Sequence, residues 1–312
     1  AGLTRAARGL WPAALVYGGW LAFARGYFGT LWPNTLAAKA AGGEGQAYQL
    51  EQLARQGAIV AATDGVLVLV LLGALAAGVR SGGRLRLHPG VRDLPWAWPV
   101  AGPLLHVARG VAVLSRYLVP LLPVLGWLAW RALDRALHLQ PARRGLATGA
   151  VIAALVLGQN LYTYAFMVRP QIDSFSAGMN RSLIPWGRWF DQHAQPNAVI
   201  AAPDIGALGY FGRRRVVDLA GLVTPAMVPI LRRMPQEDAV AQFEFAHFSR
   251  PDYVVDRAGR PWDLARRSPW SAALIPLGHA SLPNLGVARP GEAVYSFYRI
   301  DWAAYDSLAA AR

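Results

Sequence analysis

The 312-residue sequence contains no cysteine, which excludes disulfide bridges, cysteine-ligated zinc, iron–sulfur clusters and thiol catalysis. Charged residues are also scarce, at 16% of the chain, whereas a typical soluble domain has about 25%. Because 54% of the residues are hydrophobic, the composition argues against disorder and against an ordinary cytosolic enzyme. Lysine is nearly missing as well, since every basic residue except Lys39 is an arginine.

Motifs for familiar active sites are missing too. The sequence shows no Ser/His/Asp arrangement, no nucleophile elbow and no Gly-x-Gly-x-x-Gly phosphate loop. His88 and His106 have no companions at metal-ligand spacing, so we expect no metal and no cofactor. The residues by themselves therefore identify no enzyme class.

The positive charge is concentrated in the more hydrophobic half of the chain. Of the net charge of +13, residues 1–168 carry +10 and residues 169–312 carry +3. Basic residues between apolar runs are typical of a membrane protein, whereas a nucleic-acid-binding protein gathers them on one face. We therefore expect contact with membrane lipid and none with nucleic acid.

Five apolar stretches predict a polytopic α-helical membrane domain over residues 1–168, since a bilayer-crossing helix needs about 20 residues. The stretches run from about Leu10 to Phe28, Ala58 to Val79, Leu94 to Leu114, Tyr117 to Leu133 and Leu146 to Val168. Arginines lie before the first stretch, after the second and after the fourth, at positions 5, 8, 80, 84, 86, 92, 131, 135, 143 and 144. The positive-inside rule then predicts a multi-pass protein of a bacterial cytoplasmic (inner) membrane, with its C-terminal domain outside.

Residues 169–312 have the pattern of a small α/β extracytoplasmic domain. Short β-rich runs at 198–202, 215–219, 252–255 and 293–300 alternate with helical segments at 180–193, 224–233 and 236–248. Trp186 and Trp189 lie on the first of these helical segments, so we expect that helix to dock on the membrane surface.

Several polar residues in or near the predicted spans are candidates for function. Asp64 and Arg109 fall inside spans, where an ionisable residue is a functional candidate or a structural ion-pair partner. Arg116, at the outer end of the fourth span, suits either a bidentate phosphate contact or an interface anchor. In the α/β domain, Asp204 is interpreted as a helix N-cap. Asp218, at a strand end, suits a turn-forming residue or a ligand contact.

Four motifs in this order resemble the C-terminal half of bacterial GT-C glycosyltransferases, the class related to protein O-mannosyltransferases and arabinofuranosyltransferases. They are Tyr27–Lys39 (YFGTLWPNTLAAK), Ser115–Pro123 (SRYLVPLLP), Asp204–Phe211 (DIGALGYF) and Val216–Leu222 (VVDLAGL). The resemblance implies transfer of a sugar from a polyprenyl-phosphate-linked donor to a cell-envelope glycan or protein acceptor. It also implies a catalytic aspartate in a first outer loop, which this chain lacks, so we expect that residue upstream of Ala1.

Within this resemblance, Arg116 and Lys39 are expected to hold the lipid phosphate, with Tyr117 and Asn34 as hydrogen-bonding support. The catalytic base stays unassigned, with Glu44 as a fallback. Two alternatives remain open: a non-catalytic, membrane-anchored glycan-binding module, and a transporter in which Asp64, Arg109 and Arg116 line a pathway.

Overall fold

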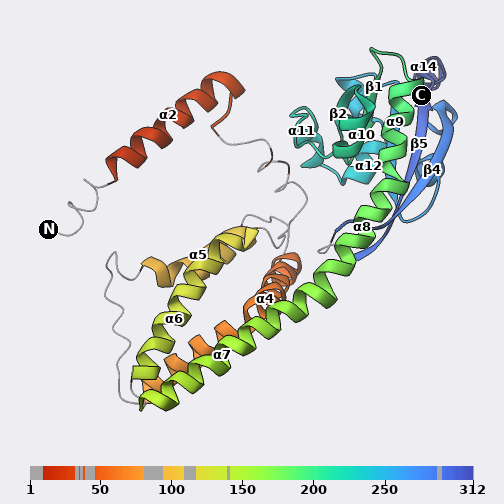
Figure 1. The fold of residues 1–312 in the computed structure, drawn as a ribbon. Coiled ribbons are helices and arrows are strands. Elements are labelled where there is room, and N and C mark those ends of the chain that lie inside the picture. Colours follow the sequence, from red (N-terminus) through yellow and green to blue (C-terminus); the bar gives the residue numbers. More distant parts are fainter. Residues whose placement is uncertain are drawn as a thin grey trace. The chain divides into compact units, whose positions relative to one another are not determined.

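The computed structural model describes residues 10–31, 35, 38, 46–80, 94–108, 117–138, 141–286 and 290–311. The chain divides into two compact units, one made of residues 1–33 and 43–166 and the other of residues 34–42 and 167–312 (Figure 1). The first unit is helical where it is described, and the second combines helices with a sheet.

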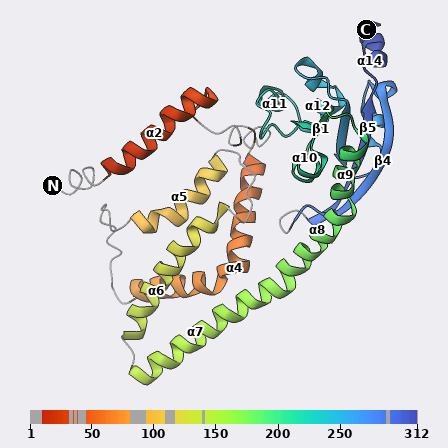
Figure 2. The ribbon, with the colours of Figure 1, turned by 45° about the horizontal axis from the view of Figure 1, so that its top comes forward.

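The helices of the first unit differ widely in length. They are α2 (Trp11–Phe28), α4 (Gln46–Arg80), α5 (Leu94–Ala108), the 3₁₀ turn Val119–Leu121, α6 (Leu122–His138), α7 (Ala142–Tyr162) and the π-helical turn Thr163–Val168. The two halves of α4 run in different directions, because the backbone of Asp64 leaves the helical conformation (Figure 2). Leu118 and Leu121 are buried against Ile59 and Val60 of α4.

The predicted five-span membrane domain is wrong. Among the described residues, only the stretches Tyr48–Ala74 and Arg143–His193 form helices long and apolar enough to cross a membrane. Over the described residues, α5 has 15 residues, with Pro99 and Pro103 inside it, and α6 has 17, and neither is among these two stretches. The continuation of the third predicted span, residues 109–114, lies outside the described residues.

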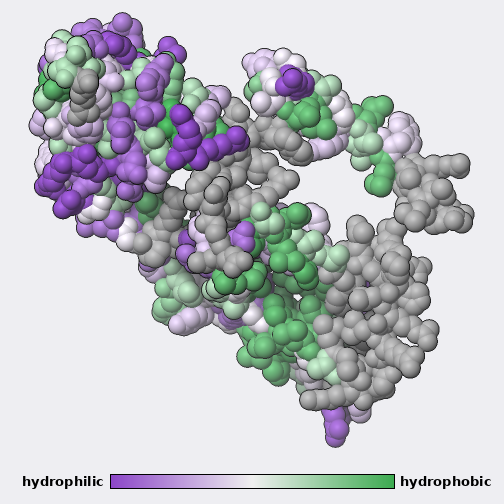
Figure 3. All heavy atoms as spheres, turned by 180° about the vertical axis from the view of Figure 1, so that it is seen from behind, coloured by the Kyte–Doolittle hydropathy of each residue, from purple (hydrophilic) through white to green (hydrophobic). Residues whose placement is uncertain are grey.

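Two apolar helices are a weak indication that the chain associates with a membrane, and they fix neither the number of crossings nor an orientation. Hydrophobic side chains dominate the visible surface of the described helical unit, whereas hydrophilic ones gather on the α/β unit (Figure 3). The structure as a whole is a mixed helix–sheet protein rather than a polytopic helical bundle with an appended domain.

The second unit is built on a five-stranded sheet with the order β2-β1-β3-β5-β4. Strand β1 pairs in parallel with β2 and with β3, and β5 pairs antiparallel with β3 and with β4. The strands are β1 (Val199–Ala202), β2 (Arg215–Asp218), β3 (Tyr253–Ala258), β4 (Leu274–Asn284) and β5 (Pro290–Ile300). The helices are α8 (Arg169–Arg181), α9 (Leu183–His193), α10 (Ile205–Gly212), α11 (Met227–Leu231), α12 (Gln236–Ala241), α13 (Asp263–Arg267) and α14 (Trp302–Ala310), with 3₁₀ turns at Glu244–His247 and Ser271–Ala273.

Both faces of this sheet are covered by helices, because successive side chains of a strand point to opposite faces. Val254 and Tyr298 belong to a core on one face with residues of α11, α12 and α13, against which α14 also packs. Val255 and Phe297 belong to a second core on the other face with residues of α9 and α10. The unit is therefore a three-layer α/β structure.

The helix predicted to dock on a membrane instead packs on this sheet. The Trp186 ring stacks on Phe297 with 3.9 Å between ring centroids, and the Trp189 ring lies against Phe190. Trp186 also occupies the space where a side chain at Gly278 of β4 would lie, 2.6 Å from an ideal Cβ. Both tryptophans of α9 thus contribute to the core of the α/β unit, and the prediction of a tryptophan-mediated docking helix is wrong.

Candidate functional site

Most residues predicted to hold a lipid phosphate lie outside the described part of the chain: Arg116, Lys39 and Asn34, together with the intramembrane candidate Arg109. Tyr117 is described, and its ring stacks on His106 of α5 with a centroid distance of 5.8 Å and an interplanar angle of 10°. The proposed phosphate site therefore stays a prediction.

Asp64 is described, and it lies at the break in α4. Its φ of −130° and ψ of 18° interrupt the helix, and its Oδ2 accepts a hydrogen bond of 2.6 Å from the hydroxyl of Thr63. Such a break frees backbone groups, which have to find partners where water is scarce.

Helix α7 and the π-helical turn that follows it supply those partners through one polar side chain each. The Gln159 amide donates to the carbonyl of Ala61 at 2.7 Å and accepts from the backbone N–H of Val66 at 2.9 Å. The Thr163 hydroxyl donates to the carbonyl of Ala62 at 2.7 Å. The polar groups around Asp64 therefore serve to brace a broken helix, which is a structural role.

The α/β unit offers a second place for a site, at the carboxyl ends of its parallel strands. The chain leaves β1 toward β2 on one side and later returns through β3 on the other side of β1. In open α/β sheets, ligands bind where the connections diverge in this way. A pocket of about 150 Å³ lies there, lined by Pro203, Pro235, Gln236, Glu237, Val240, Val255, Asp256 and Arg257.

A carboxylate held from two sides lies beside this pocket. Asp204 follows β1, and its Oδ2 accepts hydrogen bonds of 2.7 Å from both the Arg257 guanidinium of β3 and the Tyr295 hydroxyl of β5. The side chains of Asp204 and Arg257 are 38% and 26% exposed, so the ion pair is reachable from solvent. No described residue donates to the other oxygen, Oδ1, which leaves it available to a ligand. Asp204 does occupy the N-cap position of α10, but its side chain makes no capping hydrogen bond.

The ionisation of this cluster follows from burial and charge. Burial raises the pKa of Tyr295 far above its usual value, and the charge of Asp204 raises it further, so the hydroxyl stays protonated and acts as a donor. Burial lowers the pKa of Arg257, but Asp204 and Tyr295 more than offset this, and the net effect raises it. The site at neutral pH is therefore a salt bridge with one donating phenol.

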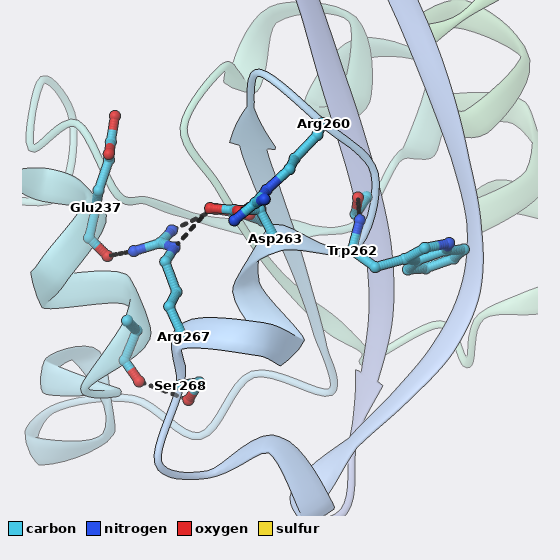
Figure 4. Close-up of polar contacts among 9 residues, drawn as sticks. Glu237, Arg260, Trp262, Asp263, Arg267 and Ser268 are labelled. Carbon is cyan, nitrogen blue, oxygen red and sulfur yellow. Dashed lines mark hydrogen bonds and ion pairs between the residues drawn. The ribbon is translucent and has the colours of Figure 1, made fainter.

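A second charged cluster lies on the opposite face of β3, under the pocket. The Arg267 guanidinium of α13 contacts Asp256 at 3.0 Å and Asp263 at 3.2 Å, and it donates to the backbone carbonyl of Glu237 (Figure 4). Arg260 pairs with Asp263 at 2.6 Å. In Figure 4 the Arg267 head group lies between Glu237 and Asp263, whereas the Trp262 indole points away from the cluster.

Asp256 is the most deeply buried member of this second cluster. It is 4% exposed, and its Oδ2 has no hydrogen-bond partner among the described residues. Burial raises its pKa, and the neighbouring Arg267 charge opposes that effect. Asp256 contributes to the pocket lining, but its Oδ2 is itself buried and unpartnered among the described residues, so its role is to balance the charge of Arg267.

Asp218, the remaining acidic residue at this edge, has a structural role. Its carboxylate oxygens accept from the backbone N–H groups of Ala220 and Val223, both at 2.9 Å. It is buried and closes the turn after β2. Of the two interpretations that the sequence left open for Asp218, the structure supports the turn.

The sequence identified Asp204 but not its partners or the Asp256 cluster. The two partners are 53 and 91 positions away along the chain, so only the pairing of β1, β3 and β5 brings them together. The one available signal was the position of Asp256 and Arg257 at the end of a β-rich run, where functional residues of α/β folds gather.

Comparison with known proteins finds a match to one family model, over part of the chain only. Residues 175–299 match a domain of unknown function, DUF8728. No match was found among curated proteins or among solved structures. The matched segment contains the whole carboxyl-end site, including Asp204, Asp256, Arg257 and Tyr295.

Proposed function

We propose that the α/β unit binds a cell-envelope glycan at its carboxyl-end site, as the acceptor-binding part of a membrane glycosyltransferase that takes its sugar from a polyprenyl phosphate. The observation that carries the binding function is the fixed carboxylate of Asp204, with one oxygen held by Arg257 and Tyr295 and the other free of donors from described residues. The transferase context comes from the resemblance of the sequence motifs.

The chemistry of the site suits hydroxyl groups. A sugar ring presents adjacent hydroxyls as donors, and an immobilised carboxylate is the strongest neutral-pH acceptor for them. The pocket, at about 150 Å³, is smaller than the roughly 300 Å³ of a drug-sized ligand site, so it suits one sugar ring of a longer chain. The side chains of Gln236 and Glu237 at its rim add further polar groups.

A second candidate is a glycan-binding module without transferase activity. It is favoured by the geometry of Asp204, whose Oδ2 already accepts hydrogen bonds from Arg257 and Tyr295, so that the carboxylate is held in place as an acceptor. Asp204 thus suits hydrogen-bond acceptance better than removal of a proton from an acceptor hydroxyl.

For location, we propose that the α/β unit faces the outer side of a bacterial cytoplasmic membrane. The support is the excess of arginine in residues 1–168, since cytoplasmic segments beside a membrane carry such an excess. The two apolar helical stretches agree with a membrane-associated chain.

Binding is tested with the full chain in detergent micelles, titrated with mannose, galactose, glucose, arabinose and short oligomers of each, and followed by saturation-transfer NMR. Asp204→Asn should weaken binding by roughly 10- to 100-fold, since a hydrogen bond to a charged group contributes about 1.5–3 kcal/mol. Asp306→Asn on α14 is the matched control, because it removes the same charge from an exposed ion pair, the one that Asp306 forms with Arg250.

Absence of saccharide binding, or equal effects of the two substitutions, would contradict the binding proposal. Transfer is assayed separately, with radiolabelled polyprenyl-phosphate mannose as donor and the bound oligomer as acceptor. Binding without transfer would select the glycan-binding module over the glycosyltransferase.

A further inference from the structure

A second hollow in the α/β unit lies on the helix layer formed by α9 and α10, away from the carboxyl-end site. It has a volume of about 520 Å³, and we call it the arginine hollow after its lining residues: Arg188, Asp191, Tyr210, Phe211 and Arg213. Its volume falls within the range of roughly 300–1,000 Å³ seen for ligand sites. The proposed glycan site makes no use of it.

The arginine hollow is positively charged. Arg188 and Arg213 are exposed, and neither forms an ion pair with any described residue. The one acidic residue in the lining, Asp191, is paired with Arg214 at 3.3 Å. Two guanidinium groups therefore remain for an anion from outside.

A neighbouring arginine, Arg214, links the two helices that form the hollow. Arg214 is only 10% exposed, and its guanidinium also donates to the carbonyl oxygens of Asp191 at 2.8 Å and Ala194 at 2.9 Å, which ties the end of α9 to the end of α10. Arg213 has a φ of +49°, a left-handed conformation that favours glycine or asparagine, so an arginine there is strained. Arg213 is the C-cap residue of α10, the position at which helices commonly end in this conformation.

Aromatic side chains complete the surface. The Arg188 guanidinium lies 5.5 Å from the centre of the Phe211 ring, and Tyr210 is 78% exposed. Helices α9 and α10 approach closely at Gly187, where a Cβ would come within 2.8 Å of the Phe211 Cβ. The hollow thus combines two arginines and two aromatic rings on two closely packed helices.

We propose that the arginine hollow docks the α/β unit onto anionic phospholipid headgroups. A guanidinium forms paired hydrogen bonds with phosphate oxygens, and tyrosine is enriched where membrane and water meet. The apolar helical stretches of the same chain indicate membrane association, which raises the local concentration of lipid around the unit. This docking surface replaces the tryptophan face of α9, which is packed on the sheet.

The experiment uses the full chain in liposomes of phosphatidylcholine, with or without phosphatidylglycerol. Because the chain has no cysteine, Gly206→Cys introduces a unique site for a fluorophore one turn before Tyr210, where open space surrounds the new Cβ. Lipids with a nitroxide on the headgroup quench a fluorophore that lies at the membrane surface. Ser307→Cys, exposed on α14 across the sheet, is the control position.

Quenching at position 206 should require phosphatidylglycerol and decline with salt, and position 307 should stay unquenched. Each arginine near an anionic surface strengthens binding about fivefold, so Arg188→Gln with Arg213→Gln should weaken docking roughly 25-fold. Arg266→Gln, an exposed arginine on α13 across the sheet, should leave it unchanged. Quenching that does not depend on phosphatidylglycerol, or that is unchanged when both arginines are replaced, would overturn the proposal. Loss of quenching with inorganic phosphate, but not with chloride at equal ionic strength, would also overturn it by marking a soluble phosphate site.

Discussion

Replacing Arg267 by methionine should destabilise the α/β unit more than loss of a partly exposed ion pair usually does. The substitution keeps a long unbranched side chain and removes the charge that contacts Asp256 and Asp263. Asp256 then remains 4% exposed with neither oxygen compensated by a cation. The loss of stability comes from the buried carboxylate that is left without a cation, in addition to the lost attraction between the two charges.

The magnitude follows from the burial of each partner. Breaking a buried ion pair by removing one partner costs about 3–5 kcal/mol. The Arg267 side chain is one-quarter exposed, so the lower end of that range applies, about 3 kcal/mol. For a unit of this size, this corresponds to a fall in unfolding temperature of roughly 10 °C. Adding Asp256→Asn should recover most of the loss, because it removes the stranded charge.

The assay is thermal unfolding of the full chain in detergent, followed by tryptophan fluorescence, with the two single variants and the double variant forming a thermodynamic cycle. Arg266→Met, which changes an exposed neighbour on the same helix, is the control. A loss below about 1 kcal/mol in Arg267→Met, or no recovery in the double variant, would refute the assignment of Asp256 as a buried charge that Arg267 compensates.

Three further predictions concern the brace of α4, the close helix contact at Gly187 and the pH dependence that arises from Asp256. Gln159→Leu should expose the Val66 amide to hydrogen exchange and cost about 1–3 kcal/mol, because the break in α4 loses its brace; unchanged protection of that amide would contradict this. Gly187→Ala should lower the unfolding temperature, because its Cβ would lie 2.9 Å from a backbone oxygen, whereas Gly206→Ala has open space and should raise the temperature or leave it unchanged. Since burial raises the folded-state pKa of Asp256, the folded state holds that proton more tightly, and stability should fall as the pH rises from about 4 through the raised pKa. Asp256→Asn should remove this decline in a series of unfolding measurements at different pH values.

The sequence predicted the strands of the α/β unit better than the helices of the first unit. Runs of β-branched residues identified β1, β2, β3 and β5, whereas β4 was missed because Pro276, Gly278 and Pro283 interrupt it. At the edge of the sheet these residues are tolerated, and Gly278 is required by the approach of Trp186. Hydropathy, by contrast, measures only composition, so it did not register the interruption of α4 at Asp64 or the effect of the two prolines inside α5.

The candidate site was predictable only in part. The sequence showed Asp204 as a polar residue after a strand and correctly predicted that it occupies the N-cap position of α10. It did not predict that the side chain makes no capping hydrogen bond. The contacts of the Asp204 side chain depend on the register that sets Arg257 opposite Tyr295, and a shift of one strand by one residue would put these two side chains on opposite faces. Such register comes from the packing of both sheet faces, which a single sequence does not display.

That register also explains how one strand end supports two separate tasks. Asp256 and Arg257 are consecutive, so they point to opposite faces of β3. Arg257 joins the reachable pair with Asp204, whereas Asp256 joins the buried network with Arg267. Changes at Asp204 should therefore alter ligand binding with little effect on folding, and changes at Arg267 should do the reverse. If both substitutions instead lowered stability and binding together, the two clusters would form one cooperative network, and the carboxyl-end site would be a structural feature of the sheet rather than a place for a ligand.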